Sequence, residues 1–287
     1  MIMRDADLLC LGKNGFHRMH YVEWGDPDAL NIVICAHGLT RSGRDFDVLA
    51  QALLPAFRVV CPDIVGRGRS EWLDDKNDYS YAQYCADMAA LIARVTAGTR
   101  PRHIYWVGTS MGGILGMLLA SRPKSPIERL VVNDVGMIVP KTALQRLALY
   151  VGKDPRFGSF DELAAFMRTV SAPFGPLTDE QWHHLTLHSA MKHADGSWGF
   201  NYDPGIGIPF QKGALEDVNL LGVWDHIACA TLLLRGADSD LLPREVALEM
   251  TQRGPRPRLV EFAGVGHAPM LLTPDQTAIV REFLSGP

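Results

Sequence analysis

The sequence has no surplus of basic residues, no long apolar run and few cysteines, and each absence excludes a class of protein. The sequence has 28 Lys and Arg residues and 32 Asp and Glu residues, which gives a net charge of −4. Nucleic acid or anionic lipid is therefore not expected as the main partner. The most apolar stretch, 104–120, is interrupted by glycines and falls short of the ~20 residues of a membrane-spanning helix. With 47% hydrophobic and 21% charged residues, the chain is neither disordered nor fibrous.

The five cysteines are an odd number, and no two of them have C-x-x-C spacing. Cys35 and Cys61 lie within apolar, strand-like runs. This pattern favours buried free thiols in a reducing compartment over a disulfide framework or a zinc site. Because residues 1–15 carry charges and lack an apolar core of signal-peptide length, we expect a cytoplasmic protein.

Short apolar runs bounded by turn residues, such as 31–37 and 103–108, alternate with helical patterns along most of the 287 residues. This alternation predicts an α/β fold with a mostly parallel, doubly wound sheet. The alternation stops at about residue 136, where prolines and aromatic residues accumulate, and resumes after residue 221. We therefore expect a core domain of residues 1–135 and 222–287, with a helical cap inserted at 136–221.

A G-x-S-x-G motif at residues 108–112 marks Ser110 as the candidate nucleophile. A strand-like run precedes the motif and a helical pattern follows it, which is the context that presents such a serine on a tight turn. The N–H of Met111 opens the helix and is predicted to donate to the oxyanion of a tetrahedral intermediate. The Leu39 N–H, just after the strand at 31–37, is predicted to be the second donor of this oxyanion hole.

The candidate general base is His267, in the late segment 264–269 (Gly-Val-Gly-His-Ala-Pro). Glycines on both sides let the backbone bend and the proline stops a helix, so a loop presents the imidazole. His37 is expected to be structural. His184 and His188 share a helical face at a spacing that could bind metal, but no glutamate completes an H-E-x-x-H motif. We therefore expect a polar face there and no metal site.

No cofactor is expected. The sequence has neither a Walker P-loop nor the third glycine of a dinucleotide-binding motif, and acyl transfer through serine requires no cofactor. The aromatic residues of segment 136–221 suggest an apolar pocket for a small or medium acyl substrate. The expected partner is a small-molecule ester or acyl compound, with no role for nucleic acid or membrane.

Six strings together resemble the α/β-hydrolase fold family, and bacterial serine esterases in particular, over nearly the whole chain. They are HGLTRSGRDFD, PDIVGRGRSEW, GTSMGG, NDVG, RGADSDLLP and GVGHAP. The resemblance implies a core sheet of about eight strands with a helical cap inserted after the sixth. It also implies that the loop at 63–70 shapes the pocket floor without a catalytic role.

The acid of the implied triad departs from the family's commonest pattern. The usual acid is the fourth residue of a G-x-x-D turn after the seventh strand. Here residues 236–239 put Ser239 in that register, with Asp238 and Asp240 on either side. Some short-capped esterases and the dehalogenases of this fold place the acid at the end of the sixth strand, which corresponds to Asp134. We favour Asp134, with Asp240 as the alternative and Asp238 third.

The sequence therefore predicts a serine hydrolase that cleaves carboxylic esters or related activated carbonyls through an acyl-enzyme. A C–C bond hydrolase, a lactonase or an amidohydrolase is the runner-up, because cap geometry decides the substrate. A non-catalytic ligand receptor is the alternative from another class, and the intact Ser110, His267 and acid candidates favour catalysis over it. The aspartate nucleophile of epoxide hydrolases and dehalogenases is excluded by Ser110.

Overall fold

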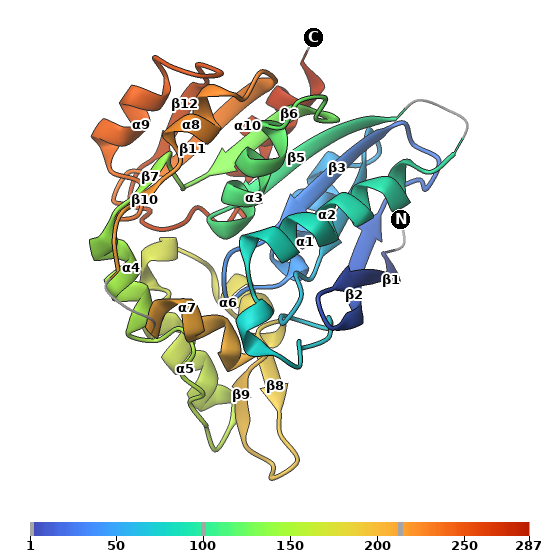
Figure 1. The fold of residues 1–287 in the computed structure, drawn as a ribbon. Coiled ribbons are helices and arrows are strands. Elements are labelled where there is room, and N and C mark those ends of the chain that lie inside the picture. Colours follow the sequence, from blue (N-terminus) through green and yellow to red (C-terminus); the bar gives the residue numbers. More distant parts are fainter. Residues whose placement is uncertain (1–2, 99–101, 212–214, 287) are drawn as a thin grey trace.

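The computed structural model describes residues 3–98, 102–211 and 215–286. Its centre is an eight-stranded sheet in the order β1-β2-β4-β3-β5-β6-β11-β12 (Figure 1). The β1–β2 and β2–β4 pairs are antiparallel and the other five are parallel. The predicted mostly parallel, doubly wound sheet is confirmed. The strands are β1 (Arg4–Gly12), β2 (Gly15–Trp24), β3 (Asn31–Ala36), β4 (Arg58–Pro62), β5 (His103–Thr109), β6 (Ile127–Asn133), β11 (Ala230–Gly236) and β12 (Arg258–Phe262).

Helices cover both faces of the sheet because its central strands are apolar on both sides. In β3, residues 32–36 are fully buried, as expected of a parallel strand between two helical layers. The helices α1 (Asp47–Leu53) and α10 (Pro274–Ser285) pack in the core of one face. The helices α2 (Tyr81–Thr96), α3 (Met111–Ala120), α8 (Leu221–Asp225) and α9 (Arg244–Met250) pack in the core of the other. Among the described residues, no helix combines the length and apolarity needed to cross a membrane.

The described part of the segment between β6 and α8 gathers at one end of the sheet (Figure 1). Its helices are α4 (Lys141–Ala148), α5 (Phe160–Val170), α6 (Asp179–Leu187) and α7 (Ile208–Gln211). The segment also contains two short strand pairs that the sequence pattern did not indicate: β7 (Ile138–Val139) pairs with β10 (Val218–Asn219), and β8 (Ala190–Lys192) pairs with β9 (Trp198–Phe200). Short 3₁₀ turns complete the chain: η1 (Gly43–Phe46), η2 (Lys76–Asp78), η3 (Ala172–Phe174) and η4 (Pro204–Gly207).

The β8–β9 hairpin has a local cause in its turn. Asp195-Gly196 lies between the two strands, and Gly196 has φ 87°, which a residue with a side chain rarely adopts. The His193 N–H donates to the Ser197 carbonyl across the turn at 2.8 Å. An Asp-Gly pair is a hairpin signal even within a helical region.

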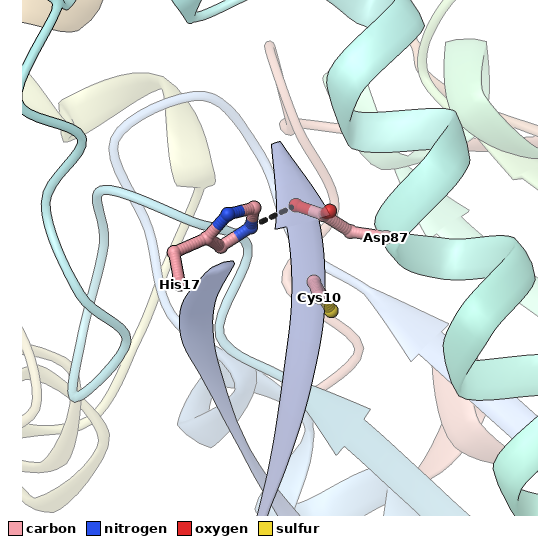
Figure 2. Close-up of side chains that lie close together, drawn as sticks. All are labelled: Cys10, His17 and Asp87. Atoms are coloured by element: carbon pink, nitrogen blue, oxygen red, sulfur yellow. Dashed lines mark hydrogen bonds and ion pairs between the residues drawn. The ribbon is translucent and has the colours of Figure 1, made fainter. Parts of the chain in front are cut away.

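A buried polar cluster joins the β1–β2 hairpin to α2 (Figure 2). Cys10 and His17 are cross-strand partners, and His17 Nε2 lies 3.0 Å from Asp87 Oδ2. Burial, reinforced by Asp87, raises the pKa of the Cys10 thiol to about 12, and the thiol donates a hydrogen bond to that carboxylate. Cys10 is therefore a neutral thiol within the packing between hairpin and helix. All five cysteines are free.

Candidate active site

Ser110 lies on the sharp turn between β5 and α3, at the carboxyl end of a central strand. Its φ of 53° and ψ of −117° are unusual for a residue with a side chain and represent backbone strain of the kind found at functional sites. Backbone hydrogen bonds hold this geometry: the Ser110 N–H donates to the Asn133 carbonyl at 2.9 Å, and the Gly113 N–H donates to the Ser110 carbonyl at 2.8 Å.

The two motif glycines are required by close approach. A Cβ on Gly112 would lie 1.9 Å from the Ala36 carbonyl oxygen, and a Cβ on Gly108 would lie 2.2 Å from the Gly112 carbonyl oxygen. Any side chain at either position would push α3 away from β3 and β5. The motif therefore encodes the position of Ser110 through backbone packing.

His267 and Asp134 form a continuous hydrogen-bonded chain with Ser110. His267, in the loop after β12, has its Nε2 3.0 Å from Ser110 Oγ, and its Nδ1 lies 2.7 Å from Asp134 Oδ2. Asp134 directly follows β6 and is fully buried. Because the carboxylate accepts the Nδ1–H, the Nε2 lone pair faces the serine hydroxyl, the tautomer that a general base requires.

Ser239 contacts the Asp134 carboxylate, a role that the sequence did not indicate. Its hydroxyl lies 2.7 Å from Asp134 Oδ2, and the Gly236 N–H donates to Asp134 Oδ1 at 2.8 Å. The residue in the usual register of the acid thus binds the carboxylate that reaches the histidine. The displaced G-x-x-D register was the available signal for this contact.

The alternative acid lies elsewhere. Asp240 is half-exposed and receives two hydrogen bonds from Arg146, at 2.6 and 3.0 Å. Asp238 is exposed. Among the described residues, neither carboxylate has a hydrogen bond to His267. The structure brings together Ser110, His267 and Asp134, and leaves Asp240 in a separate ion pair.

The two predicted oxyanion donors flank the serine. Met111 begins α3, and Leu39 follows Gly38, where an added Cβ would lie 3.7 Å from Ser110 Cβ. Within the described residues neither the Leu39 nor the Met111 N–H has a hydrogen-bond acceptor, so both can donate to a substrate oxygen. His37 supports this loop: its Nδ1–H donates to the Gly38 carbonyl at 2.7 Å and its Nε2 accepts from the Ile64 N–H at 2.9 Å. Burial lowers the pKa of His37 to about 4, so it is neutral.

Comparison with known proteins agrees with this geometry. The sequence model of the alpha/beta hydrolase family matches residues 33–280. The chain belongs to this family. It is 46% identical over 285 residues to a 3-hydroxybutyrate-oligomer hydrolase from Cupriavidus necator, covering 96% of both chains. It is 26% identical to a pimeloyl-[acyl-carrier protein] methyl ester esterase from Vibrio cholerae, covering 83% of this chain and 88% of the relative.

A solved structure of an alpha/beta hydrolase from Novosphingobium aromaticivorans superposes with a TM-score of 0.86 at 33% identity, over 99% of both chains. These similarities show that the chain is a hydrolase.

A cavity of about 230 Å³ opens onto Ser110 and His267 of this hydrolase. One wall is apolar and comes from segment 136–221. The other walls come from the loop after β3 and the loop after β12. The apolar wall residues are Leu147, Leu149, Tyr150, Phe166, Met167, Val170, Phe174, Phe200 and Tyr202. Such a pocket suits a short carbon chain beside the serine.

Three cationic side chains also line the cavity. Arg41 is paired with Asp45, with hydrogen bonds of 2.8 and 2.6 Å, and Arg146 is paired with Asp240. Lys153 is exposed and, among the described residues, has no carboxylate partner. It is thus the lining cation whose charge is not already paired with a carboxylate in the described chain.

His184 and His188 lie together beside Asp47, where α6 meets the core. Arg44 already binds the Asp47 carboxylate, at 2.9 Å from its Nε, and His184 Nε2 lies 2.9 Å from the Arg44 carbonyl. Burial, with Arg44 as the next cause, lowers the pKa of His188 to about 4. A metal ion here would face the positive charge of Arg44, so these residues fit contacts between α6 and the core better than a metal centre.

Proposed function

We propose that the protein hydrolyses carboxylic esters through a covalent acyl-enzyme, with Ser110 as nucleophile, His267 as base and Asp134 as acid. The observation that carries the proposal is the unbroken hydrogen-bonded chain from Ser110 Oγ through the imidazole to Asp134. It begins on a strained turn and opens into an apolar cavity. This arrangement of roles is the one that activates a serine hydroxyl.

In this mechanism His267 Nε2 removes the hydroxyl proton as Ser110 Oγ forms a bond to the ester carbonyl carbon. The carbonyl oxygen becomes negatively charged and accepts hydrogen bonds from the Leu39 and Met111 N–H groups. The imidazolium then gives its proton to the departing alkoxide as the C–O bond breaks. Water repeats the sequence, releasing the acid and restoring Ser110.

The proposed substrates are short oligomers of a 3-hydroxy acid of the 3-hydroxybutyrate type. The 46% identical relative is a 3-hydroxybutyrate-oligomer hydrolase. A methyl-substituted acyl unit fits the apolar wall, and the free carboxylate at one end of such an oligomer suits the unpaired charge of Lys153. We further propose that segment 136–221 acts as a cap that selects chain length, and that the enzyme works in the cytoplasm.

The test is steady-state turnover of 3-hydroxybutyrate dimer and trimer beside p-nitrophenyl esters of increasing acyl length. We expect hydrolysis of the oligomers and a preference for short acyl groups. Binding of these compounds without turnover would replace the hydrolase mechanism with a receptor function at this site.

A further inference from the structure

Arg67, in the loop after β4, is one of the largest fully buried side chains of the protein. In the described part of the chain no carboxylate forms an ion pair with it. A buried charge without a counter-ion is costly, and an apolar side chain of similar volume would fill the same space at lower cost. The position of this charge therefore requires an explanation.

The Arg67 guanidinium contacts both residues of the proposed oxyanion hole. Its Nε–H donates to the Leu39 carbonyl at 2.8 Å, and its Nη2 lies 3.7 Å from Met111 Sδ. The opposite side of the group is held by the Val65 carbonyl at 2.7 Å and by the Tyr84 hydroxyl at 3.0 Å, with the Tyr84 ring 4.9 Å from the guanidinium carbon. One rigid, planar cation thus joins the loop after β3 to the start of α3.

We propose that Arg67 is a positioning residue that sets the geometry of the oxyanion hole and adds positive charge behind it. The proposal rests on the proposed function, because it concerns the same Leu39 and Met111 donors. The hydrogen bond to the Leu39 carbonyl holds the Leu39–Thr40 peptide group, and this restricts the turn whose preceding peptide group carries the Leu39 N–H. A charge in a low-dielectric interior also acts over a longer distance than in water.

The backbone of this loop is held independently of the Arg67 side chain. The Asp63 carboxylate accepts hydrogen bonds from the Gly43 N–H at 2.8 Å and the Arg69 N–H at 2.9 Å. The Gly68 N–H donates to the Asn201 carbonyl at 3.0 Å. Substitution of the side chain therefore tests the guanidinium and leaves these loop contacts in place.

The experiment compares wild type with Arg67→Met, Arg67→Lys and the control Arg58→Met. Arg58 begins β4, the strand that precedes the Arg67 loop, and it binds Glu23 at 2.8 Å, away from the cavity. For a p-nitrophenyl ester, Arg67→Met should lower kcat by about 10- to 100-fold and leave KM within about threefold. The reason is that a misplaced N–H donor stabilises the transition state less, while substrate binding is little affected. Arg67→Lys keeps the positive charge but loses the planar guanidinium, so its kcat should lie between those of the wild type and Arg67→Met.

Inhibition by an alkyl boronic acid separates positioning from general destabilisation. This probe forms a tetrahedral anion on the serine, so its Ki should rise by the same factor as kcat falls, whereas the Ki of the product acid should stay unchanged. Arg58→Met should alter thermal stability but neither constant. If Arg67→Met does not fold, the same parallel loss must appear in Arg67→Lys.

Two results would overturn the proposal, and they differ from each other. In the first, the wild-type protein turns over the ester, and the Arg67→Met or Arg67→Lys variant has the same kcat and the same boronate Ki as the wild type. This result would remove the role of Arg67 and leave the proposed function in place. A wild-type protein that neither turns over esters nor binds the boronate at Ser110 would remove the proposed function and this role with it.

Discussion

Two His–Asp pairs of similar geometry lie in different parts of the molecule. His267 Nδ1 is 2.7 Å from Asp134 Oδ2, and His17 Nε2 is 3.0 Å from Asp87 Oδ2. Both aspartates are almost fully buried. Each pair also has a side chain beside it that could act as a nucleophile, a serine at the first and a cysteine at the second (Figure 2).

The order of the three groups distinguishes the two clusters. At the candidate active site the histidine stands in the middle and uses both ring nitrogens, one toward Asp134 and one toward Ser110. In the hairpin cluster the aspartate stands in the middle, with Cys10 and His17 both hydrogen-bonded to it. An imidazole can relay a proton only from the middle position, so residue types alone do not define a triad.

Replacing the two candidate nucleophiles should show the largest contrast between the clusters. Ser110→Ala should lower kcat by about 10⁴- to 10⁶-fold, because the covalent step is lost. Cys10→Ser, which keeps a hydroxyl donor for Asp87, should leave kcat within about twofold, because the thiol takes no part in catalysis. Steady-state kinetics on one p-nitrophenyl ester measures both. A large loss of kcat in Cys10→Ser, with the fold intact, would contradict the comparison.

Substitution of the two buried aspartates should give the next largest contrast in kcat. Asp134→Asn should cost up to ~10⁴-fold in kcat, because asparagine favours the wrong tautomer of the histidine. Asp87→Asn should leave kcat within about threefold and lower the free energy of unfolding by about 1–3 kcal/mol, because the amide replaces one of the two oxygens that accept hydrogen bonds from the surrounding donors. Denaturant titration and kinetics of the same preparations separate the two effects.

Asp240→Asn is the matched control for the acid. Its ion pair with the half-exposed Arg146 should contribute about 0–1 kcal/mol, so kcat should stay near the wild-type value. A crippled Asp240→Asn beside a nearly normal Asp134→Asn would move the acid to the loop after β11.

Ser239 allows the acid to be moved deliberately. Ser239→Ala should lower kcat by about 3- to 10-fold, because one hydrogen bond to the Asp134 carboxylate is lost. The double variant Asp134→Asn with Ser239→Asp places a carboxylate in the family's usual register and should recover part of the kcat lost in Asp134→Asn. No recovery in a folded double variant would show that the loop after β11 does not direct that side chain toward His267.

Lys153→Gln should give the smallest effect. For a 3-hydroxybutyrate trimer we expect KM to rise by about two- to fivefold, because one exposed charge contact is lost. KM for the methyl ester of the same trimer, which lacks the carboxylate, should not change. Lys192→Gln, on β8 and outside the cavity lining, is the control. Equal increases for acid and ester would contradict carboxylate recognition.

The positions of Ser110 and His267 could be predicted because short strings encode them. Gly108 and Gly112 leave no room for a side chain, and the turn around His267 is bounded by glycine and proline. The sheet could be predicted equally well from the sequence, because strands buried on both faces are apolar along their whole length. Local sequence was sufficient wherever local packing decides the conformation.

The contacts of the proposed acid, Asp134, and of Arg67 could not be predicted in the same way. Asp134 and Asp240 both follow buried strands, and the difference lies in the φ of 56° at Asp134 and in the Ser239 hydroxyl more than 100 residues away. The sequence indicated only that the loop of Arg67 shapes the pocket floor. The contacts of the Arg67 side chain with three other segments are not visible in the sequence. Long-range contacts decide these features, and a single sequence does not display them.

The most direct test of the central claim is covalent labelling with a fluorophosphonate, followed by mass-spectrometric mapping of the modified peptide. The probe reacts with serines activated by a general base. We predict one adduct per chain, on Ser110, with labelling lost in Ser110→Ala, strongly slowed in Asp134→Asn and unchanged in Asp87→Asn. An adduct on another residue, or labelling that persists in Ser110→Ala, would contradict the account.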